Sequence, residues 1–537
     1  MRRWNGWGDD SFHLELPDNG ETFLRARLGR AESLGEATLG AVCKRVPPSL
    51  LPEHELVHRD AETRVRHARG QSLDDWLAMR SGEFGHFPDG VALPETSEQV
   101  AQLLQWACEV DADVIPYGGG TSVAGHINPR ASQRPVLTLS LERMNRLLDL
   151  DTESQIATFG AGTPGPLVEA QLLAQGYTLG HFPQSFELST LGGWVASRSS
   201  GQQSLRYGRI EQLFAGGHLE TLEGPWEIPT FPASAAGPDV REMILGSEGR
   251  LGIITEVKVR VTPVPDRESF HVLFFPDWEA ARTCARELVQ NRTFLSMLRL
   301  SNAMETETQL ALAGHPTLIG MLERYLSVRG AGDGKCMMTI GVTGTRDQCR
   351  TGLRELRRIS RRHGGVYTGT HLGKKWEAKR FTMPYLREAL WQHGYVVDTL
   401  ETATDWDNVD ALMGRIEGTL RNGLEAEGEQ VHVFTHLSHV YSQGCSIYTT
   451  YVFRCADSYE ETHRRWARLK AATSETIVRN RGTISHQHGV GRDHAPYLPI
   501  EKGPMTMAAL NALSLRFDPQ QRLAPGVLLS ERGADNE

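Results

Sequence analysis

The chain has 537 residues, of which 39% are hydrophobic and 23% charged, and its formal net charge is -9. This length exceeds what a single hydrophobic core supports, so two or more domains are expected. The acidic balance argues against a nucleic-acid-binding protein, because no basic surplus exists to meet phosphates. No run of about 18 apolar residues occurs, so no transmembrane helix is predicted. Arg2 and Arg3 are not followed by the apolar run of a secretory signal.

The seven cysteines are scattered, odd in number and without a C-x-x-C pair. This pattern indicates free thiols in a reducing compartment rather than disulfides or a zinc site, and it predicts a cytoplasmic location. Peripheral contact with a membrane and assembly into a homodimer are both compatible with the composition.

The first half of the chain predicts helices and strands in turn. Residues 1–86 form a helical segment, with a helix opening at 71–76. Thr96-Ser-Glu-Gln99 is a capping box before apolar positions of helical spacing, and that helix leads into a strand that ends near Ile115. Alternating residues predict strands over 137–141 and 257–261, and a helix follows Pro164 and ends before Gly176.

The Pro-rich segment 262–265 predicts a domain boundary, so the first domain is placed at 87–266. Beyond it, strands at 270–275 and 337–342 alternate with helices at 277–291 and 350–363. This alternation indicates an α+β domain at 267–457. A helix at 458–479 opens the last segment, 458–537. The arginines between 354 and 362 are interpreted as a solvated helix face.

The glycine-rich segment Tyr117-Gly-Gly-Gly-Thr121-Ser122 follows the strand that ends near Ile115. Glycines can take positive φ and have no Cβ, so successive N–H groups can surround an anionic oxygen. The spacing fits neither G-x-G-x-x-G nor a Walker loop. A plain turn between strands is the alternative for this segment alone.

Two further glycine segments favour a binding role. Ser189-Thr-Leu-Gly192-Gly193 and Gly246-Ser-Glu248-Gly249 follow the first in order, each next to a strand-like run. Three such segments predict a backbone that closely surrounds one large anionic cofactor.

These segments resemble the FAD-binding domain of the vanillyl-alcohol oxidase superfamily, also called the p-cresol methylhydroxylase (PCMH) type. Within it, the chain is most similar to the alkylglycerone-phosphate synthase family, from Arg3-Trp-Asn-Gly-Trp-Gly8 to His486-Gln-His488-Gly-Val-Gly491. The resemblance implies an α+β fold: a two-subdomain PCMH-type FAD-binding domain and a substrate (cap) domain over the flavin ring. The helical N-terminal segment precedes them, and the C-terminal helical segment completes the active site.

The resemblance also implies which residues bind FAD. They are Pro116, Gly118, Gly119, Gly120, Thr121, Ser122, Pro183, Ser185, Ser189, Thr190, Gly192, Gly193, Ser197, Ser200, Glu248, Gly249, Gly252 and Ile254. Some relatives attach the flavin to a histidine directly after the first glycines. Thr121 occupies that place here, and His126 lies further along, so non-covalent FAD is expected.

Candidate catalytic residues occur late in the chain. His486 and His488 are two positions apart, so on a strand they would face the same way, and histidine suits proton transfer near neutral pH. The resemblance adds Tyr448 as an active-site phenol and Arg299 as an anchor for an anionic substrate. Gln487 departs from the H-H-H-G-V-G motif of the synthases, and an amide cannot transfer a proton.

Two other polar clusters are interpreted without a catalytic role. His432, His436 and His439 lack the aspartate and asparagine of the metal-binding run in related hydroxy-acid dehydrogenases, so no catalytic metal is expected. Lys374, Lys375 and Arg380 could bind an anion, but an exposed turn is favoured for the two lysines.

Two activities follow from these observations. The first is an FAD-dependent oxidoreductase that removes a hydride from the CH–OH group of an anionic hydroxy acid or a polyol or phosphate substrate, with His488 or Tyr448 taking the hydroxyl proton. The second is the synthase reaction of ether-lipid biosynthesis, in which a fatty alcohol replaces the fatty acid of acyl-dihydroxyacetone phosphate without net redox. A flavoprotein without turnover is the third option. A small-molecule substrate is expected throughout.

Overall fold

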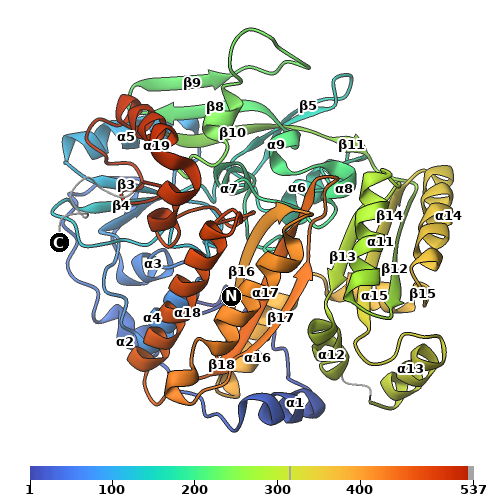
Figure 1. Cartoon of the computed structure of the whole chain (residues 1–537). Coiled ribbons are helices and arrows are strands. Elements are labelled where there is room, and N and C mark those ends of the chain that lie inside the picture. The colour runs from blue at the N-terminus through green and yellow to red at the C-terminus, as the bar shows by residue number, and fades with distance from the viewer. Residues whose placement is uncertain (314–315, 530–537) are drawn as a thin grey trace.

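The computed structural model describes residues 1–313 and 316–529, in which helices and strands are mixed along the whole chain (Figure 1). Two smaller sheets build the part that carries the glycine segments, and a seven-stranded sheet builds the part that follows. Within the described ranges, no helix combines the length and apolar character needed to cross a membrane.

The first small sheet carries the first glycine segment at the end of its edge strand β3. The strand order is β1-β2-β4-β3, with β2, β4 and β3 parallel and β1 antiparallel. Their bounds are β1 Val57–His58, β2 Gly90–Ala92, β3 Asp113–Tyr117 and β4 Val136–Ser140. Helix α5, Ser97–Glu109, leads into β3 as predicted, but the capping box is only half formed. Thr96 accepts the N–H of Gln99, whereas the Gln99 side chain accepts the N–H of Glu95.

The second small sheet is antiparallel with the order β5-β6-β10-β8-β9. The bounds are β5 Leu147–Asp151, β6 Ile156–Gly160, β8 Phe214–Thr221, β9 Gly224–Ile228 and β10 Ile253–Arg260. A short antiparallel pair, β7 Tyr177–Thr178 and β11 Thr262–Pro263, forms a separate two-stranded sheet. The helices of this region are α6 Gly165–Leu173, α7 Leu191–Ser197, α8 Ser204–Tyr207, α9 Ile210–Leu213 and α10 Arg241–Ile244. A separate apolar core made from these elements fills the space between the two sheets.

The seven-stranded sheet is antiparallel throughout, in the order β15-β12-β14-β13-β17-β18-β16. The bounds are β12 Arg267–Phe275, β13 Met297–Ser301, β14 Cys336–Gly344, β15 Val366–Tyr367, β16 Tyr395–Asp405, β17 His432–Leu437 and β18 Gly444–Arg454. One face is covered by α11 Trp278–Gln290, α14 Arg346–Arg362 and α17 Val409–Asn422, and α18 Tyr459–Arg479 packs on α17 (Figure 1). The other face carries α12 Ala303–Ala311, α15 His371–Lys379 and α16 Met383–Gln392.

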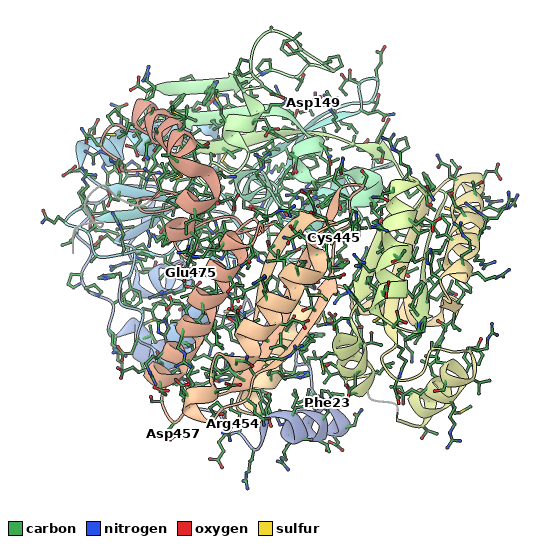
Figure 2. The ribbon with its side chains drawn as sticks, in the orientation of Figure 1. Phe23, Asp149, Cys445, Arg454, Asp457 and Glu475 are labelled. Carbon is green, nitrogen blue, oxygen red and sulfur yellow. The ribbon has the colours of Figure 1, made fainter. Side chains whose placement is uncertain are left out.

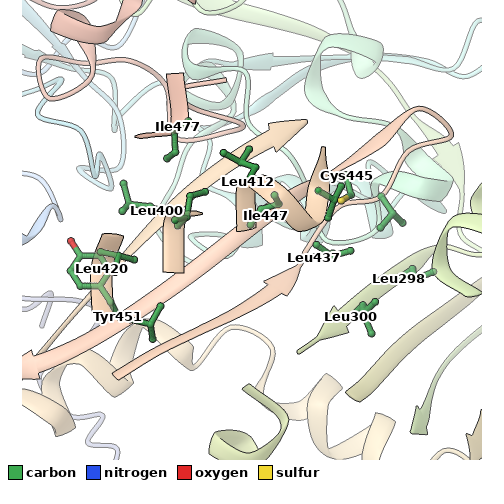
Figure 3. Packing of buried hydrophobic residues seen from close by; sticks show 14 of the residues in the cluster. Leu298, Leu300, Leu400, Leu412, Leu420, Leu437, Cys445, Ile447, Tyr451 and Ile477 are labelled. Carbon is green, nitrogen blue, oxygen red and sulfur yellow. The ribbon is translucent and has the colours of Figure 1, made fainter. Parts of the chain in front are cut away.

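Strand alternation decides which side chains of this sheet enter its core. On β18, Ile447 and Tyr451 pack with Leu412 and Leu420 of α17, as Figure 3 shows. Their neighbours Tyr448, Thr450 and Val452 therefore point to the opposite face, where they line a cavity. The same alternation separates Leu298 and Leu300 of β13 from Met297 and Arg299.

The N-terminal and C-terminal segments pack onto the small sheets and onto the seven-stranded sheet. The N-terminal segment contains α1 Asp18–Leu28, α2 Leu39–Cys43, α3 Ala61–Arg66 and α4 Leu73–Ser81, and Trp7 and Trp76 join the core of the large sheet. Helix α19, Leu498–Phe517, is interrupted at Gly503, and the chain then returns to β3. Helix α13, Pro316–Val328, lies beside β12.

Most charged side chains lie at the surface of the protein, and apolar side chains fill its interior. Asp149, Asp457 and Glu475 point outward, whereas Cys445 lies between sheet and helices (Figure 2). All seven cysteines are free thiols. The arginines of α14 are exposed, as expected. Lys374 and Lys375 are exposed too, but on helix α15 rather than a turn.

Candidate active site

A cavity of about 450 Å³ lies between the glycine segments and the face of the seven-stranded sheet that carries α12, α15 and α16. Its wall also contains Trp7, Gln71 and Trp76 from the N-terminal segment and Gln487 and His488 from the C-terminal segment. Four distant stretches of the chain therefore form one site.

The first glycine segment forms part of the cavity wall directly after β3. In the described part of the chain, the N–H groups of residues 118–122 donate to no protein group, so they are free for an anion. The glycines here also permit close packing: a Cβ on Gly119 would lie 1.8 Å from the carbonyl oxygen of Leu188. The absence of a Cβ at Gly119 thus allows the first glycine segment to pack directly against the backbone next to the second.

The predicted cofactor residues converge on this cavity, with one exception. Those in its wall are Pro116, Gly118, Gly119, Gly120, Thr121, Ser122, Pro183, Ser185, Ser189, Thr190, Gly192, Gly193, Ser197, Ser200, Glu248, Gly249 and Ile254. Gly252 does not line it. Its φ is +153°, and a Cβ there would lie 2.7 Å from the carbonyl oxygen of Glu220, so this glycine allows β10 to start close to β8.

The donors and acceptors of this wall fit a dinucleotide such as FAD. The hydroxyl of Ser200 and the amide oxygen of Gln202 are buried, line the cavity and have no partner among the described residues. With the free N–H groups of residues 118–122, they can bind diphosphate oxygens and polar edges of the cofactor. His126 is already engaged: its Nδ1 contacts Ser122 Oγ at 2.6 Å and its Nε2 lies 3.2 Å from Glu248. Non-covalent attachment stays a prediction, which acid precipitation of the protein tests.

The sheet face places Arg299 in the opposite wall, where a buried carboxylate holds it. Arg299 Nη2 lies 2.6 Å from Glu305 Oε1, and the second oxygen of Glu305 lies 2.9 Å from His436 Nδ1. These two neighbours lower the pKa of Glu305 to about 2 against the cost of burial. Because the contacts of Arg299 within the described chain use Nη2, its Nη1 can meet an anion.

Tyr448 lies between His436 and His488. Its ring stacks on His436 at 4.8 Å between centroids and meets His488 edge-on at 6.1 Å. Its hydroxyl donates to Thr399 Oγ1 at 3.2 Å. Burial raises the pKa of Tyr448 to about 12, so the phenol is a hydrogen-bond donor near neutral pH rather than a base.

The two predicted histidines differ in position. Residues 484–491 form no strand, so the expected strand periodicity is wrong here. His488 lines the cavity, and burial lowers its pKa. His486 lies behind the wall, where Tyr441 and Arg209 contact its Nε2 at 2.7 and 3.0 Å, and burial lowers its pKa to about 4. His488 is therefore the better placed proton acceptor.

Glu401 of β16 connects these residues, and no sequence motif marked it. Its side chain is buried and accepts from Ser438 Oγ and from Gln487 Nε2, each at 2.7 Å. His486 Nδ1 lies 3.1 Å from Oε1 and His488 Nε2 lies 3.8 Å from Oε2. Against the cost of burial, His486 and His439 hold the pKa of Glu401 well below its usual range.

The three histidines considered for a metal do not form one cluster. His432 contacts Thr308, and His436 contacts Glu305. His439 instead lies near Glu401 and His486, with possible ligand atoms within 4.8 Å of one another. Ser438 and Gln487 already donate to Glu401, and Tyr441 and Arg209 contact His486 Nε2. The expectation of no catalytic metal stays a prediction.

One side of the cavity is apolar. The residues of this apolar wall form one packed cluster and come from α1, α16, the sheet face and the end of α12: Leu24, Leu312, Leu386, Leu390, Val397, Phe434 and Val452. Sequence inspection missed them, because each is an ordinary apolar residue in its own element. It also missed Arg387, which lines the cavity and pairs with Asp398 at 3.1 Å.

Comparison with known proteins agrees with this geometry. Residues 88–224 match the model of an FAD-binding domain, and residues 264–528 match the C-terminal domain of FAD-linked oxidases. The fold and site thus define an FAD-dependent enzyme of the PCMH type.

Individual relatives identify the family within this class of FAD-dependent enzymes. The chain is 32% identical to alkyldihydroxyacetonephosphate synthase of Dictyostelium discoideum, over 88% of this chain and 78% of that protein. It is 27% identical to the synthase of Trypanosoma brucei brucei, over 100% and 93% of the two chains. A solved alkyldihydroxyacetonephosphate synthase structure superimposes with a TM-score of 0.84, at 26% identity and 98% coverage of both chains. The chain belongs to the alkyldihydroxyacetonephosphate synthase family, also called the alkylglycerone-phosphate synthases.

Proposed function

We propose that this enzyme carries out the synthase reaction, in which a fatty alcohol displaces the fatty acid of acyl-dihydroxyacetone phosphate. The observation that carries the proposal is the apolar wall beside Arg299 and His488 in a single cavity. Each buried methylene group of an alkyl chain contributes about 0.8 kcal/mol, so such a wall suits a long chain. A small hydroxy acid would leave it unused. The nearly full-length similarity to synthases supports the same choice.

The reaction balances without an external oxidant. The C–O bond between the dihydroxyacetone carbon and the acyl group's carboxylate oxygen breaks, and the electron pair leaves with the carboxylate. The same carbon gains the alcohol oxygen, and the alcohol proton is released. Bound FAD supplies, at N5 of its ring, a centre that can exchange an electron pair with a substrate carbon.

The residues of this chain divide the remaining work. The glycine segments would hold FAD, and Arg299 Nη1 would bind the substrate phosphate. His488, neutral because its pKa is lowered, would take the alcohol proton. Tyr448, whose phenol is protonated, would turn its O–H from Thr399 Oγ1 to the substrate. His486 would position Glu401 without meeting substrate.

Oxidation of a hydroxy acid or polyol is the competing activity, since a neutral His488 at the cavity wall could equally accept its hydroxyl proton. Purified enzyme should be given acyl-dihydroxyacetone phosphate and a fatty alcohol, and the alkyl ether measured by mass spectrometry. Parallel samples should contain 2-hydroxy acids or polyols and an electron acceptor. Ether formation without acceptor reduction supports the synthase. Acceptor reduction without ether would overturn the proposal.

A cytoplasmic location, peripheral membrane contact and a homodimer stay predictions.

A further inference from the structure

Gln487, the residue that departs from the triple-histidine motif, has a defined orientation at the cavity wall. Its Nε2 donates to Glu401 Oε2 at 2.7 Å. Glu401 is an acceptor only, because its pKa is held well below the usual range. The amide nitrogen must therefore face the carboxylate, and the amide oxygen must face away from it.

The carboxylate that orients Gln487 is itself fixed from behind. Ser438 donates to Oε1 of Glu401, and His486 Nδ1 lies 3.1 Å from the same oxygen. Arg209 in turn donates to the backbone oxygen of His486 at 2.9 Å and contacts its Nε2 at 3.0 Å. A chain of polar contacts thus runs from Arg209 to Gln487 and places the carboxylate that orients the amide.

The amide oxygen of Gln487 is buried and has no partner among the described residues. A buried carbonyl without a donor is unfavourable, so this oxygen suits a ligand that brings an N–H or O–H group. In the proposed reaction, the ketone, ester and phosphate oxygens of acyl-dihydroxyacetone phosphate are acceptors. The hydroxyl of the fatty alcohol is a donor.

We infer that Gln487 Oε1 binds the hydroxyl of the incoming fatty alcohol and positions it beside His488. This inference rests on the proposed synthase function. Gln487 and His488 share Glu401 Oε2, at 2.7 and 3.8 Å, so an alcohol held by the amide lies next to the imidazole that takes its proton. The hydroxyl hydrogen turns from the amide oxygen to the imidazole when the C–O bond forms. Gln487 is thus a positioning residue that determines specificity for the alcohol.

The same geometry would let glutamine take the place of the central histidine of the motif. A neutral imidazole can donate one N–H to Glu401 and present its bare nitrogen to the cavity. Glutamine presents the same pair, a donor behind and an acceptor in front. The position therefore needs an acceptor and not a proton carrier.

Steady-state kinetics of Gln487→Met and Gln487→His test this inference. Gln487→Met keeps the side-chain volume and removes the acceptor, so the KM for hexadecanol should rise about tenfold while the KM for acyl-dihydroxyacetone phosphate stays within twofold. Gln487→His should stay within threefold of wild type for both. Gln105→Met, at an exposed glutamine of α5, is the matched control. FAD content and melting temperature verify that each variant folds.

A second measurement detects the hydrogen bond itself. A thiol is a weak donor, so wild type should bind hexadecanol more tightly than hexadecanethiol, as inhibition constants of the thiol show. Gln487→Met should lose most of that preference, about fivefold or more. The inference would be overturned if Gln487→Met changed the KM of both substrates equally, or if it left the preference for the alcohol over the thiol unchanged. Ether formation by the wild-type enzyme would still support the synthase function in that case. If wild type makes no ether, both proposals are wrong.

Discussion

The carboxylate of Glu248 accepts the backbone N–H of Gly491 at 2.8 Å. It also accepts the N–H of Val490 at 2.5 Å, so a residue of the third glycine segment holds the C-terminal loop that contains Gln487 and His488. Glu248 has φ +52°, an uncommon conformation for a non-glycine residue, and its side chain is buried. The cofactor side and the catalytic loop are thus joined at one carboxylate.

Glu248→Gln should loosen this loop. The amide of glutamine replaces one carboxylate oxygen, which accepts, by an NH₂ group, which donates. Losing the hydrogen bond from the loop reduces the stability of the loop by about 2 kcal/mol and lowers turnover by roughly tenfold or more. Hydrogen exchange of residues 485–494 measures the effect, with Glu220→Gln as the control because Glu220 is buried but pairs with His218 outside the cavity. Unchanged exchange in this loop would contradict the role given to Glu248.

Gly193→Asp should abolish FAD retention without unfolding the protein. Gly193 lines the cavity, and a Cβ there would meet only Thr190 Oγ1, at 3.2 Å. The new carboxylate would therefore enter the space of the diphosphate and repel it. Gly119→Asp is the contrasting variant, because its side chain would collide with Leu188 and destabilise the fold. Absorbance at 450 nm and the melting temperature separate the two effects. A Gly193→Asp protein that stays yellow would refute the placement of the FAD diphosphate beside Gly193.

Arg299→Lys should weaken binding of the phosphate-bearing substrate about tenfold and change kcat less. Lysine keeps the charge near Glu305 but loses the fork that can bind the carboxylate and an anion together. KM for acyl-dihydroxyacetone phosphate is the measurement, and Arg350→Lys on the exposed face of α14 is the control. A KM equal to that of wild type would remove Arg299 from substrate binding.

His488→Ala should leave FAD bound and reduce turnover by at least a hundredfold. The wild-type rate should rise with pH as His488 loses its proton and then level off. Because burial lowers the pKa of His488, the midpoint of this rise should lie below pH 6.5, the ordinary histidine value. A pH profile of kcat/KM for the alcohol checks this. A midpoint above 6.5 would mean that another group is the base.

Treatment with a chelator should leave activity unchanged. Glu401, His439 and His486 have ligand-like spacing, but Ser438, Gln487, Tyr441 and Arg209 already contact their polar atoms. Dialysis against EDTA followed by metal analysis and a rate measurement tests the expectation. Loss of activity that zinc or manganese restores would place a metal at these residues and favour the oxidase chemistry.

Local patterns determined much of this protein in advance. Strand and helix periodicity, caps and glycine runs act over a few residues, so β10, β12, α11 and α18 lie close to where the sequence predicts them. The glycine segments indicated a large anionic cofactor for the same reason, because a backbone that must approach an anion needs glycine at consecutive positions. The resemblance then identified that cofactor as FAD and added Arg299 and Tyr448 to the two histidines that their spacing had suggested.

Only the tertiary structure decided how these residues divide the work. Glu401 is one acidic residue in an ordinary strand, and its importance comes from β16 lying beside β18 and beneath the C-terminal loop. Likewise, His486 and His488 are equivalent in sequence, yet an irregular loop buries one behind the wall and exposes the other to the cavity. Contacts between residues 86 positions apart, such as Glu401 and Gln487, depend on packing that no local propensity encodes.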